Sequence, residues 1–420
     1  MRVNNSVFSV DVLVVGAGPA GSTAAINAAQ RGSTVLLIDA ATFPRDKTCG
    51  DGLTPRAVHQ LEKIGIDVTS RYASKGLKLH GFGGSVTAPW PQSPFGTISS
   101  AMPRSEFDEL LLNTAQQHSN VQVWQGVTAV SVEASPASSQ PTSEFPKAGR
   151  IRTVTLDDGR VVAPAFVIVA DGVRSTFGKL LGRQWHRGEV YGIAARSYCE
   201  TPRGDDPWMH SHLELRDDTG TAQPGYGWIF PLGNGTANVG CGALSTDARP
   251  AKVNTKKLLQ SYAQQQSDEW GFGVPQRVTS ALLPIGGAVS NVAGPNWMLI
   301  GDAAACVNPL NGEGIDYGME TAALAVSLMG TDADLSHAWP ELLRSTYGEA
   351  FLLARTAARL LTYPRLLPIA GPLALRKPAR HRHYASGRTA HGQPCLGLRS
   401  RSCCAALALC RNRREPLAPR

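Results

Sequence analysis

Three glycines and one carboxylate near the N-terminus have the residue types and the spacing that a dinucleotide site requires. Gly16, Gly18 and Gly21 form the pattern G-x-G-x-x-G, and Asp39 follows Gly21 by 18 positions. In this pattern the first glycine permits a tight turn, the second lets the backbone approach a pyrophosphate, and the third allows a helix to pack closely on a strand. A carboxylate at the position of Asp39 accepts hydrogen bonds from a ribose. These residues therefore predict a dinucleotide-binding site.

The segments around these glycines have the patterns of the elements that would position them. Residues 11–15 and 34–39 are rich in β-branched residues and leucine, as buried parallel strands are, and Gly32 ends the helix between them. A helix that begins at the glycine turn directs its N-terminus at the pyrophosphate. A strand–helix–strand unit without a ligand is the alternative, and the acid that closes the second strand argues against it.

Two later strands lead into acids in a similar way. Residues 166–170 precede Asp171, and residues 297–300 precede Gly301 and Asp302. Because open α/β sheets bind ligands at the carboxyl ends of their strands, both acids are candidate site residues.

A glycine-rich loop carries a thiol. Cys49 and Gly50 open the loop, and a helix is expected to follow it with Thr54 as the N-cap and Pro55 in the first turn. Two interpretations are open: Cys49 is a small buried apolar residue, or its thiol lies beside a ligand.

The middle of the chain changes to short alternating segments that are typical of antiparallel strands, such as residues 211–215 and 236–243. We expect them to form a second sheet inserted into the nucleotide-binding fold, with a solvated loop at 134–149. The predicted parts are a discontinuous nucleotide-binding domain (8–75, 100–188 and 284–335), an antiparallel-sheet domain (76–99 and 189–283), a helical segment (336–375) and a tail (376–420).

Composition and charge narrow the classes of protein that fit. The 420 residues are 42% hydrophobic, and the net charge is +8. Residues 376–420 hold 11 Lys and Arg against one acid, so the remaining 30 basic and 32 acidic residues give residues 1–375 a net charge of −2. The body therefore has no basic surface that would indicate nucleic acid. The eight cysteines lack C-x-x-C spacing, so we expect neither a metal site nor a disulfide framework.

The motifs taken together resemble those of the para-hydroxybenzoate-hydroxylase-type flavoproteins. The matching residues are Gly16, Gly18, Gly21 and Asp39, Arg104 in R-S-E-F-D, Asp171-Gly172, and Gly301-Asp302 followed by N-P-L-N-G-E-G at 308–314. Two further segments, K-T-C-G-D-G at 47–52 and P-G-Y-G-W-I-F-P at 224–231, are similar to those of the geranylgeranyl reductase family. Within that family the chain is most similar to the actinobacterial menaquinone reductase branch, over about residues 8–378.

This resemblance implies an α/β fold, in which an FAD-binding Rossmann-like domain carries an inserted antiparallel-sheet substrate domain. It also implies an FAD-dependent reductase that saturates an isoprene double bond in the prenyl tail of a polyprenyl lipid, menaquinone in this branch. Reduced flavin would supply hydride, and Cys49, or a water that it orients, would supply the proton. Tyr226, Trp228 and Phe230 would line a prenyl channel, with plain sheet core as the alternative. The implied cofactor-binding residues are Gly16, Gly18, Ala20, Gly21, Asp39, Cys49, Gly50, Arg104, Asp171, Gly301, Asp302, Gly312, Gly314 and Ile315.

Several alternatives stay open at this level. A flavin monooxygenase shares nearly all of the FAD motifs, and an inactive flavoprotein with a damaged C-terminus would also fit. Because only one G-x-G-x-x-G is present, the electron donor is either NAD(P)H visiting the FAD cleft or a redox protein. No secretory signal and no stretch of about 18 apolar residues is present, so we expect a cytoplasmic protein. Its attachment would be peripheral, at the inner face of the cell membrane, and apolar leucine pairs within 337–375 fit either a core face or a face on the bilayer.

The tail departs from the family. Residues 376–420 contain no Ile, Val, Met, Phe or Trp, so they cannot bury enough apolar surface to become ordered, and we expect disorder. Three interpretations of the tail are open: a basic segment that binds anionic lipid headgroups, a basic segment that binds nucleic acid, and an out-of-frame translation. The abrupt change in composition favours the last of these.

Overall fold

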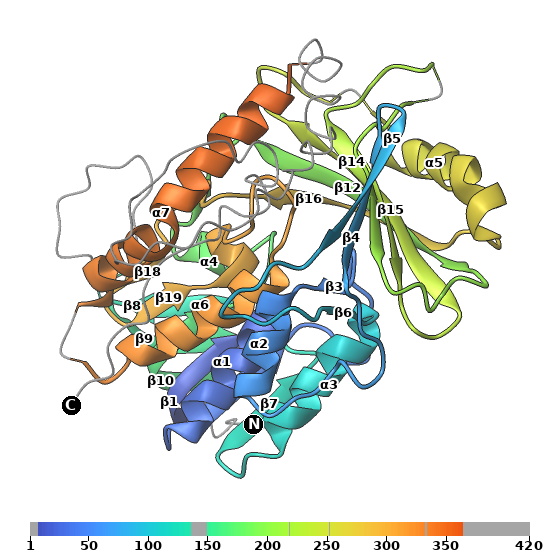
Figure 1. Cartoon of the computed structure of the whole chain (residues 1–420). Helices are drawn as coiled ribbons and strands as arrows, with labels where there is room; N and C mark the ends of the chain where they lie inside the picture. The colour runs from blue at the N-terminus through green and yellow to red at the C-terminus, as the bar shows by residue number, and fades with distance from the viewer. Residues whose placement is uncertain (1–6, 136–148, 218, 252, 332–333, 364–420) are drawn as a thin grey trace, which may run out of the picture.

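Two large β-sheets with helices packed around them form most of the molecule (Figure 1), and two further sheets have two strands each. The computed structural model describes residues 7–135, 149–217, 219–251, 253–331 and 334–363. The loop expected at 134–149 falls mostly outside these ranges, and the basic tail expected after residue 375 falls outside them entirely.

The first sheet contains the strands that were predicted around the glycine turn and the later acids. Its strands, in spatial order, are β18 (Ala293–Gly294), β19 (Trp297–Leu299), β10 (Val161–Val169), β1 (Phe8–Val15), β2 (Val35–Asp39) and β7 (Val121–Gln125). From β19 to β7 they run parallel. Strands β8 (Ala129–Ala134) and β9 (Ile151–Leu156) extend β10 in antiparallel pairing.

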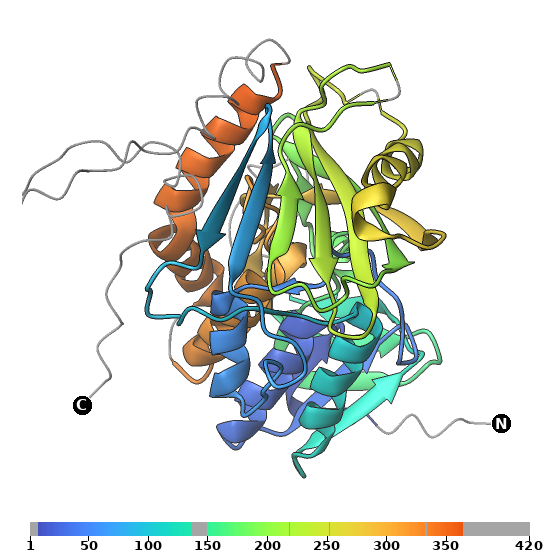
Figure 2. The same ribbon diagram turned by 45° about the vertical axis from the view of Figure 1, so that its right-hand side comes forward.

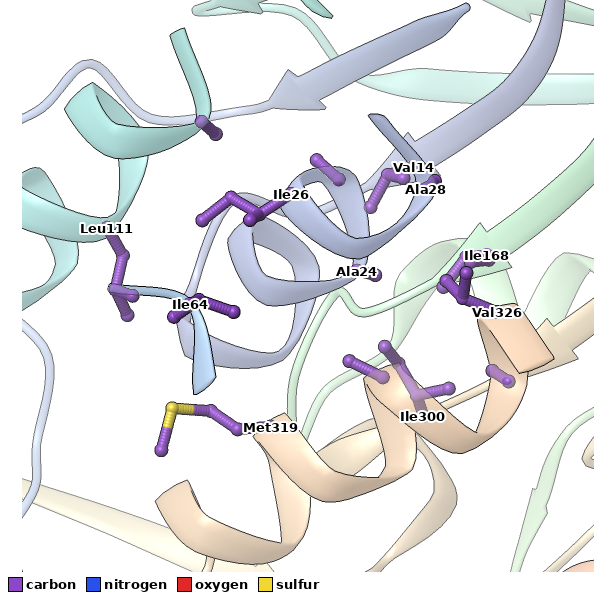
Figure 3. Close-up of a cluster of buried hydrophobic side chains, with 14 of the residues drawn as sticks. Val14, Ala24, Ile26, Ala28, Ile64, Leu111, Ile168, Ile300, Met319 and Val326 are labelled. Carbon is purple, nitrogen blue, oxygen red and sulfur yellow. The ribbon is translucent and has the colours of Figure 1, made fainter. Parts of the chain in front are cut away.

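The strands of this sheet carry apolar side chains on both faces, so both faces must be covered, and helices supply much of this cover. On one face lie α1 (Pro19–Gln30), α2 (Pro55–Lys63), α3 (Arg104–Gln116) and α6 (Ile315–Leu328). Figure 3 shows Ala24 and Ile26 of α1 in the same cluster as Met319 and Val326 of α6. Small side chains along α1 let α6 approach closely, which brings the starts of the two helices to the same region of the sheet.

The second sheet has seven strands and projects from the first (Figure 2). Its strands, in spatial order, are β16 (Gln276–Pro284), β12 (Tyr191–Glu200), β15 (Thr236–Ser245), β14 (Gly225–Pro231), β13 (Met209–His212), β4 (Gly76–Gly81) and β5 (Gly84–Pro89). Neighbours are antiparallel, as expected, except that β4 and β13, which come from distant parts of the chain, pair in parallel. Helix α5 (Thr255–Trp270) packs on one face and buries Tyr262 and Trp270 there.

Short elements complete the connections. They are β3 (Gly52–Leu53), β6 (Ser100–Ala101), α4 (Thr176–Leu180), β11 (Gln184–Trp185), β17 (Val289–Ser290) and the 3-10 helix η1 (Gly301–Ala304).

The 27-residue helix α7 (Leu335–Leu361) lies along both sheets (Figures 1 and 2). Trp339 and Phe351 are on its buried face, and the indole nitrogen of Trp339 donates to the carbonyl oxygen of Leu299 at 2.9 Å. Leu352 and Leu360 are on its exposed face. Within the described ranges, no helix combines the length and the apolar character needed to cross a bilayer.

Candidate functional site

The residues predicted to bind a dinucleotide meet at one edge of the first sheet. Because β1 runs parallel to β2 and β10, and β10 to β19, the carboxyl ends of these strands lie side by side. Gly16 follows β1, and its amide donates to Ile38 of β2 at 2.7 Å. The carboxylate of Asp39, at the end of β2, accepts from the Ala17 amide at 2.7 Å. The glycine turn and the acid are therefore in direct contact.

The glycines of the turn differ in what surrounds them. Gly16 has a φ of +102°, and a Cβ there would lie 2.4 Å from the carbonyl oxygen of Ala170. A Cβ on Gly21 would lie 1.7 Å from the carbonyl oxygen of Gly16, so neither position accepts a side chain. At Gly18, by contrast, the nearest atom to such a Cβ is a guanidinium nitrogen of Arg45, 3.5 Å away. The protein backbone leaves the start of α1 uncovered, as a bound pyrophosphate requires.

Two arginines face the start of α1. Arg104 forms two hydrogen bonds to the Asp108 carboxylate, at 2.6 and 2.7 Å, and Arg45 pairs with the same carboxylate at 2.9 Å. Two guanidinium groups thus share one carboxylate, which leaves an excess of positive charge beside Gly18. The first turn of α1 adds uncapped amides and contains no acid. This donor set fits a pyrophosphate. Arg104 was predicted, whereas Arg45 was missed because a single arginine in a loop has no sequence signal.

The two later acids have different surroundings. Asp171 accepts from the Ser175 hydroxyl at 2.6 Å and from the Phe177 amide at 2.8 Å, so both of its oxygens hold the start of α4. Burial raises the pKa of Asp171. Asp302 pairs with Lys47 at 3.2 Å, and one of its oxygens would lie 3.3 Å from a Cβ on Gly314. Asp302 therefore lies at the start of α6, with Lys47 as a partner that the sequence did not predict.

Close packing joins the starts of α1, η1 and α6. A Cβ on Gly301 would lie 3.0 Å from the Ala20 methyl and 3.4 Å from the backbone of Gly318. The predicted residues Ala20 and Gly301 thus lie where these three elements touch.

The loop before α6 meets the second sheet. Gly312 has a φ of +74°, and the Tyr226 hydroxyl of β14 donates to the Asn311 carbonyl at 2.5 Å. Gly314 is the N-cap of α6 and has no capping side chain, so amides of the first turn, which begins at Ile315, lack a side-chain cap. These amides fit a ligand group that carries partial negative charge.

Two buried carboxyls beside this turn were not predicted. Burial raises the pKa of Glu313, and the neighbouring Asp316 raises it further. Burial also raises the pKa of Asp316. The raised pKa of Glu313 favours its protonated form, which removes one negative charge from the start of α6.

The aromatic side chains of β14 lie against the Cys49 loop. A Cβ on Gly50 would lie 3.3 Å from the indole nitrogen of Trp228 and 3.4 Å from the Phe230 ring. The rings of Tyr226 and Trp228 are 5.9 Å apart, and those of Trp228 and Phe230 are 6.3 Å apart. Burial raises the pKa of the Cys49 thiol, although Arg104 opposes this shift. The structure thus brings Cys49, Gly50 and all three predicted aromatic residues together.

The same loop is fastened to both sheets. Lys47 pairs with Asp302 of the first sheet's edge, and its carbonyl oxygen accepts from Arg196 of β12 at 3.0 Å. The carbonyl oxygen of Cys49 accepts from the Asn238 side chain of β15 at 2.9 Å. The loop is therefore a bridge between the dinucleotide edge and the aromatic strand.

This fold and site define an FAD-binding flavoprotein. A family model described as "FAD binding domain" matches residues 9–355, so the chain belongs to that family. FAD is its cofactor, and the chain is an FAD-dependent oxidoreductase.

More specifically, the chain belongs to the geranylgeranyl reductase family, in the branch of the menaquinone reductases. It is 52% identical to the menaquinone reductase of Mycolicibacterium smegmatis, over 87% of this chain and 88% of that protein. The identity to digeranylgeranylglycerophospholipid reductase 1 of Methanopyrus kandleri is 27%, over 84% of this chain and 90% of that protein. A geranylgeranyl bacteriochlorophyll reductase-like protein from Thermoplasma acidophilum has the same fold, with a TM-score of 0.71, 22% identity and coverage of 87% and 91%. The family and the fold class expected from the sequence are confirmed.

Proposed function

We propose that this oxidoreductase saturates an isoprene double bond in the prenyl tail of menaquinone. The observation that carries the proposal is the contact between the aromatic face of β14 and the Cys49 loop, beside the start of α6. An apolar face next to the cofactor edge suits a substrate whose reacting part offers no hydrogen bonds. The 52% identity to proteins named menaquinone reductase supports this choice of lipid.

The residues described above would divide the work of holding the cofactor. Gly18 and Arg104, joined by Arg45, would hold the pyrophosphate, and Asp39 would accept from the ribose. Asp302 and the first amides of α6 would hold the part of FAD nearer the aromatic strand. When bound and reduced, FAD supplies the hydride that no protein side chain can provide.

The chain's own chemistry would concern the alkene and the proton. Tyr226, Trp228 and Phe230 would pack against the isoprenoid chain and exclude water from the reacting carbons. Cys49 would deliver the proton to the carbon that does not receive hydride, because a thiol with a raised pKa stays protonated at neutral pH.

Reduction of menaquinone in vesicles tests this proposal. The purified flavoprotein is reduced with dithionite under anaerobic conditions and mixed with the vesicles, and the quinone is then examined by mass spectrometry. We expect reoxidation of the flavin and, after any quinol has been reoxidised in air, a mass gain of two hydrogens that fragmentation places in the prenyl tail. A product that forms only with oxygen and carries a hydroxyl group would identify a monooxygenase instead. In Cys49→Ala, reduction by dithionite should persist while reoxidation by menaquinone slows by about 100-fold, and unchanged reoxidation would exclude Cys49 as the proton donor.

Access to this substrate would require contact with the membrane surface. Leu352, Leu353 and Leu360 of α7 are 57%, 48% and 53% exposed, while the opposite face of the helix is buried. We propose that these leucines insert at the inner face of the cell membrane, so that the protein is peripheral. In a flotation assay with anionic vesicles, the triple serine variant should lose most of its binding. Val274→Ser is the control, because Val274 is 80% exposed but lies beside α5 and not on α7.

The electron donor would be NAD(P)H or a redox protein. Anaerobic bleaching of the flavin by NADH or NADPH alone would select the nicotinamide. The absence of bleaching, with reduction restored by a host protein fraction, would select the redox protein.

A further inference from the structure

Asp51 is a fully buried carboxylate two residues after Cys49. Its backbone has a φ of +62°, in the left-handed region that glycine occupies more readily. One of its oxygens, Oδ2, accepts from the Tyr198 hydroxyl at 2.7 Å and from the Asn238 amide at 2.8 Å. The other, Oδ1, is buried and has no hydrogen-bond partner among the residues that the structure describes. Burying a carboxylate with one unpartnered oxygen costs folding free energy.

The backbone and partners of Asp51 also hold Cys49. The Asp51 amide approaches the Cys49 sulfur at 3.4 Å, within the range of a sulfur hydrogen bond. Asn238 donates both to the Asp51 carboxylate and to the Cys49 carbonyl oxygen, while its own oxygen accepts from the Trp228 indole at 2.9 Å. Asp51, Cys49 and the aromatic strand are therefore parts of one hydrogen-bond network.

Opposite charges act on the thiol in this network. Burial raises the pKa of the Cys49 thiol, and the Asp51 carboxylate raises it further. The positive charge and hydrogen bond of Arg104 lower this pKa, and so does the hydrogen bond from the Asp51 amide. Burial raises the pKa of Asp51 to about 6, against the opposing effects of Tyr198, Asn238, Arg196 and Arg104. The Asp51 carboxyl is consequently ionised at pH 7 to 8, where its charge offsets that of Arg104. An amide would accept the same hydrogen bonds at a lower desolvation cost, so the charge itself needs a role.

We propose that Asp51 is the positioning residue for Cys49: it orients the side chain and keeps the thiol protonated beside Arg104. The effect on the thiol can be measured without turnover. Its consequence for catalysis rests on the proposed function, in which Cys49 gives up a proton to the substrate.

Alkylation of the holoprotein by iodoacetamide tests the charge effect. The rate at Cys49 is followed by peptide mass spectrometry from about pH 6 to about pH 10, since only the thiolate reacts. In Asp51→Asn the midpoint should move to lower pH, and the rate at neutral pH should rise about fivefold. Asp46→Asn is the matched control: it removes a carboxylate from the same loop that pairs with Arg196 instead, and its midpoint should equal that of the wild type.

The outcomes separate a charge effect from simple loosening of the loop. If the alkylation rate of Asp51→Asn rose at high pH while its pH midpoint stayed unchanged, the Cys49 thiol would only be more exposed, and the proposal would be overturned. A wild-type midpoint below the value of free cysteine, about 8.5, would overturn it as well, and this result does not depend on whether the variant folds. In the menaquinone assay, dithionite should reduce the flavin of Asp51→Asn normally. Menaquinone should then reoxidise this flavin more slowly than in the wild type, and the decrease in rate should be greatest at high pH. If the wild type fails to reduce menaquinone, the proposed function falls while the alkylation result still stands.

Discussion

Gly18 offers a direct test of where the cofactor binds. A Cβ at Gly18 has no protein atom nearer than 3.5 Å, whereas a Cβ at Gly21 would lie 1.7 Å from a backbone oxygen. Gly18→Ala therefore fits the protein itself, and only a ligand at the start of α1 would collide with the new methyl group. Gly21→Ala collides with the protein whether or not FAD is bound.

The two variants should differ clearly in magnitude. In Gly21→Ala the helix must move by roughly 1.5 Å to relieve the contact, and such overpacking costs about 1–3 kcal/mol of folding stability. Gly18 has φ −72° and ψ −174°, which alanine adopts easily, so Gly18→Ala should change the stability of the apoprotein by less than about 1 kcal/mol. Its FAD dissociation constant should rise at least tenfold, which corresponds to about 1.4 kcal/mol.

Two measurements on the deflavinated protein check these values. Urea unfolding followed by circular dichroism gives the stability, and quenching of flavin fluorescence gives the FAD affinity. Gly188→Ala is the control, because a Cβ there has no atom within 4 Å. If Gly18→Ala bound FAD as tightly as Gly188→Ala does, the pyrophosphate would not lie at the start of α1 and the assignment would be refuted.

Three further changes probe the rest of the structure. Burial lowers the pKa of His212 to about 3 and that of His210 to about 4, so as the pH falls these histidines are protonated in the unfolded chain before the folded one. The free energy of unfolding should therefore be at its full value above about pH 6.5. Toward pH 4 it should fall by up to about 1.4 kcal/mol per pH unit for each histidine. Urea midpoints of His212→Gln should fall less steeply with acid, and an equal slope would contradict this explanation. Trp339→Phe should cost about 1–2 kcal/mol in urea unfolding, because it leaves the buried Leu299 carbonyl without its donor; wild-type stability would show that this bond contributes nothing. Trp228→Ala should lower kcat/KM for menaquinone about tenfold or more at unchanged FAD content, and an undiminished kcat/KM would remove Trp228 from the substrate face.

The dinucleotide half of the site could be predicted because its signals are local. The turn from Gly16 to Gly21 and the acid Asp39 lie within one strand–helix–strand unit, and their spacing follows from the geometry of that unit. The strand patterns before Asp171 and Asp302 also predicted the sheet edge. What they did not show is that Asp171 would use both oxygens on α4.

The rest depended on contacts between distant segments. Asp51 meets Tyr198 and Asn238 across 147 and 187 positions, and Lys47 meets Asp302 across 255. No periodicity or spacing in the sequence encodes such pairs. The parallel pairing of β4 with β13 was missed for the same reason, since alternating segments indicate strands but not their direction.

The loop that carries Cys49 restricts how a long lipid can arrive. Its contacts with Asp302 on one side, and with Arg196 and Asn238 on the other, connect the two sheets, so opening them like a hinge would break the contacts on at least one side of the loop. We therefore expect the tail to slide in lengthwise, tip first, while the quinone ring stays at the entrance. A polyprenyl chain that carries a bulky group at its free end should then not be reduced, even if its isoprene units fit against Tyr226, Trp228 and Phe230.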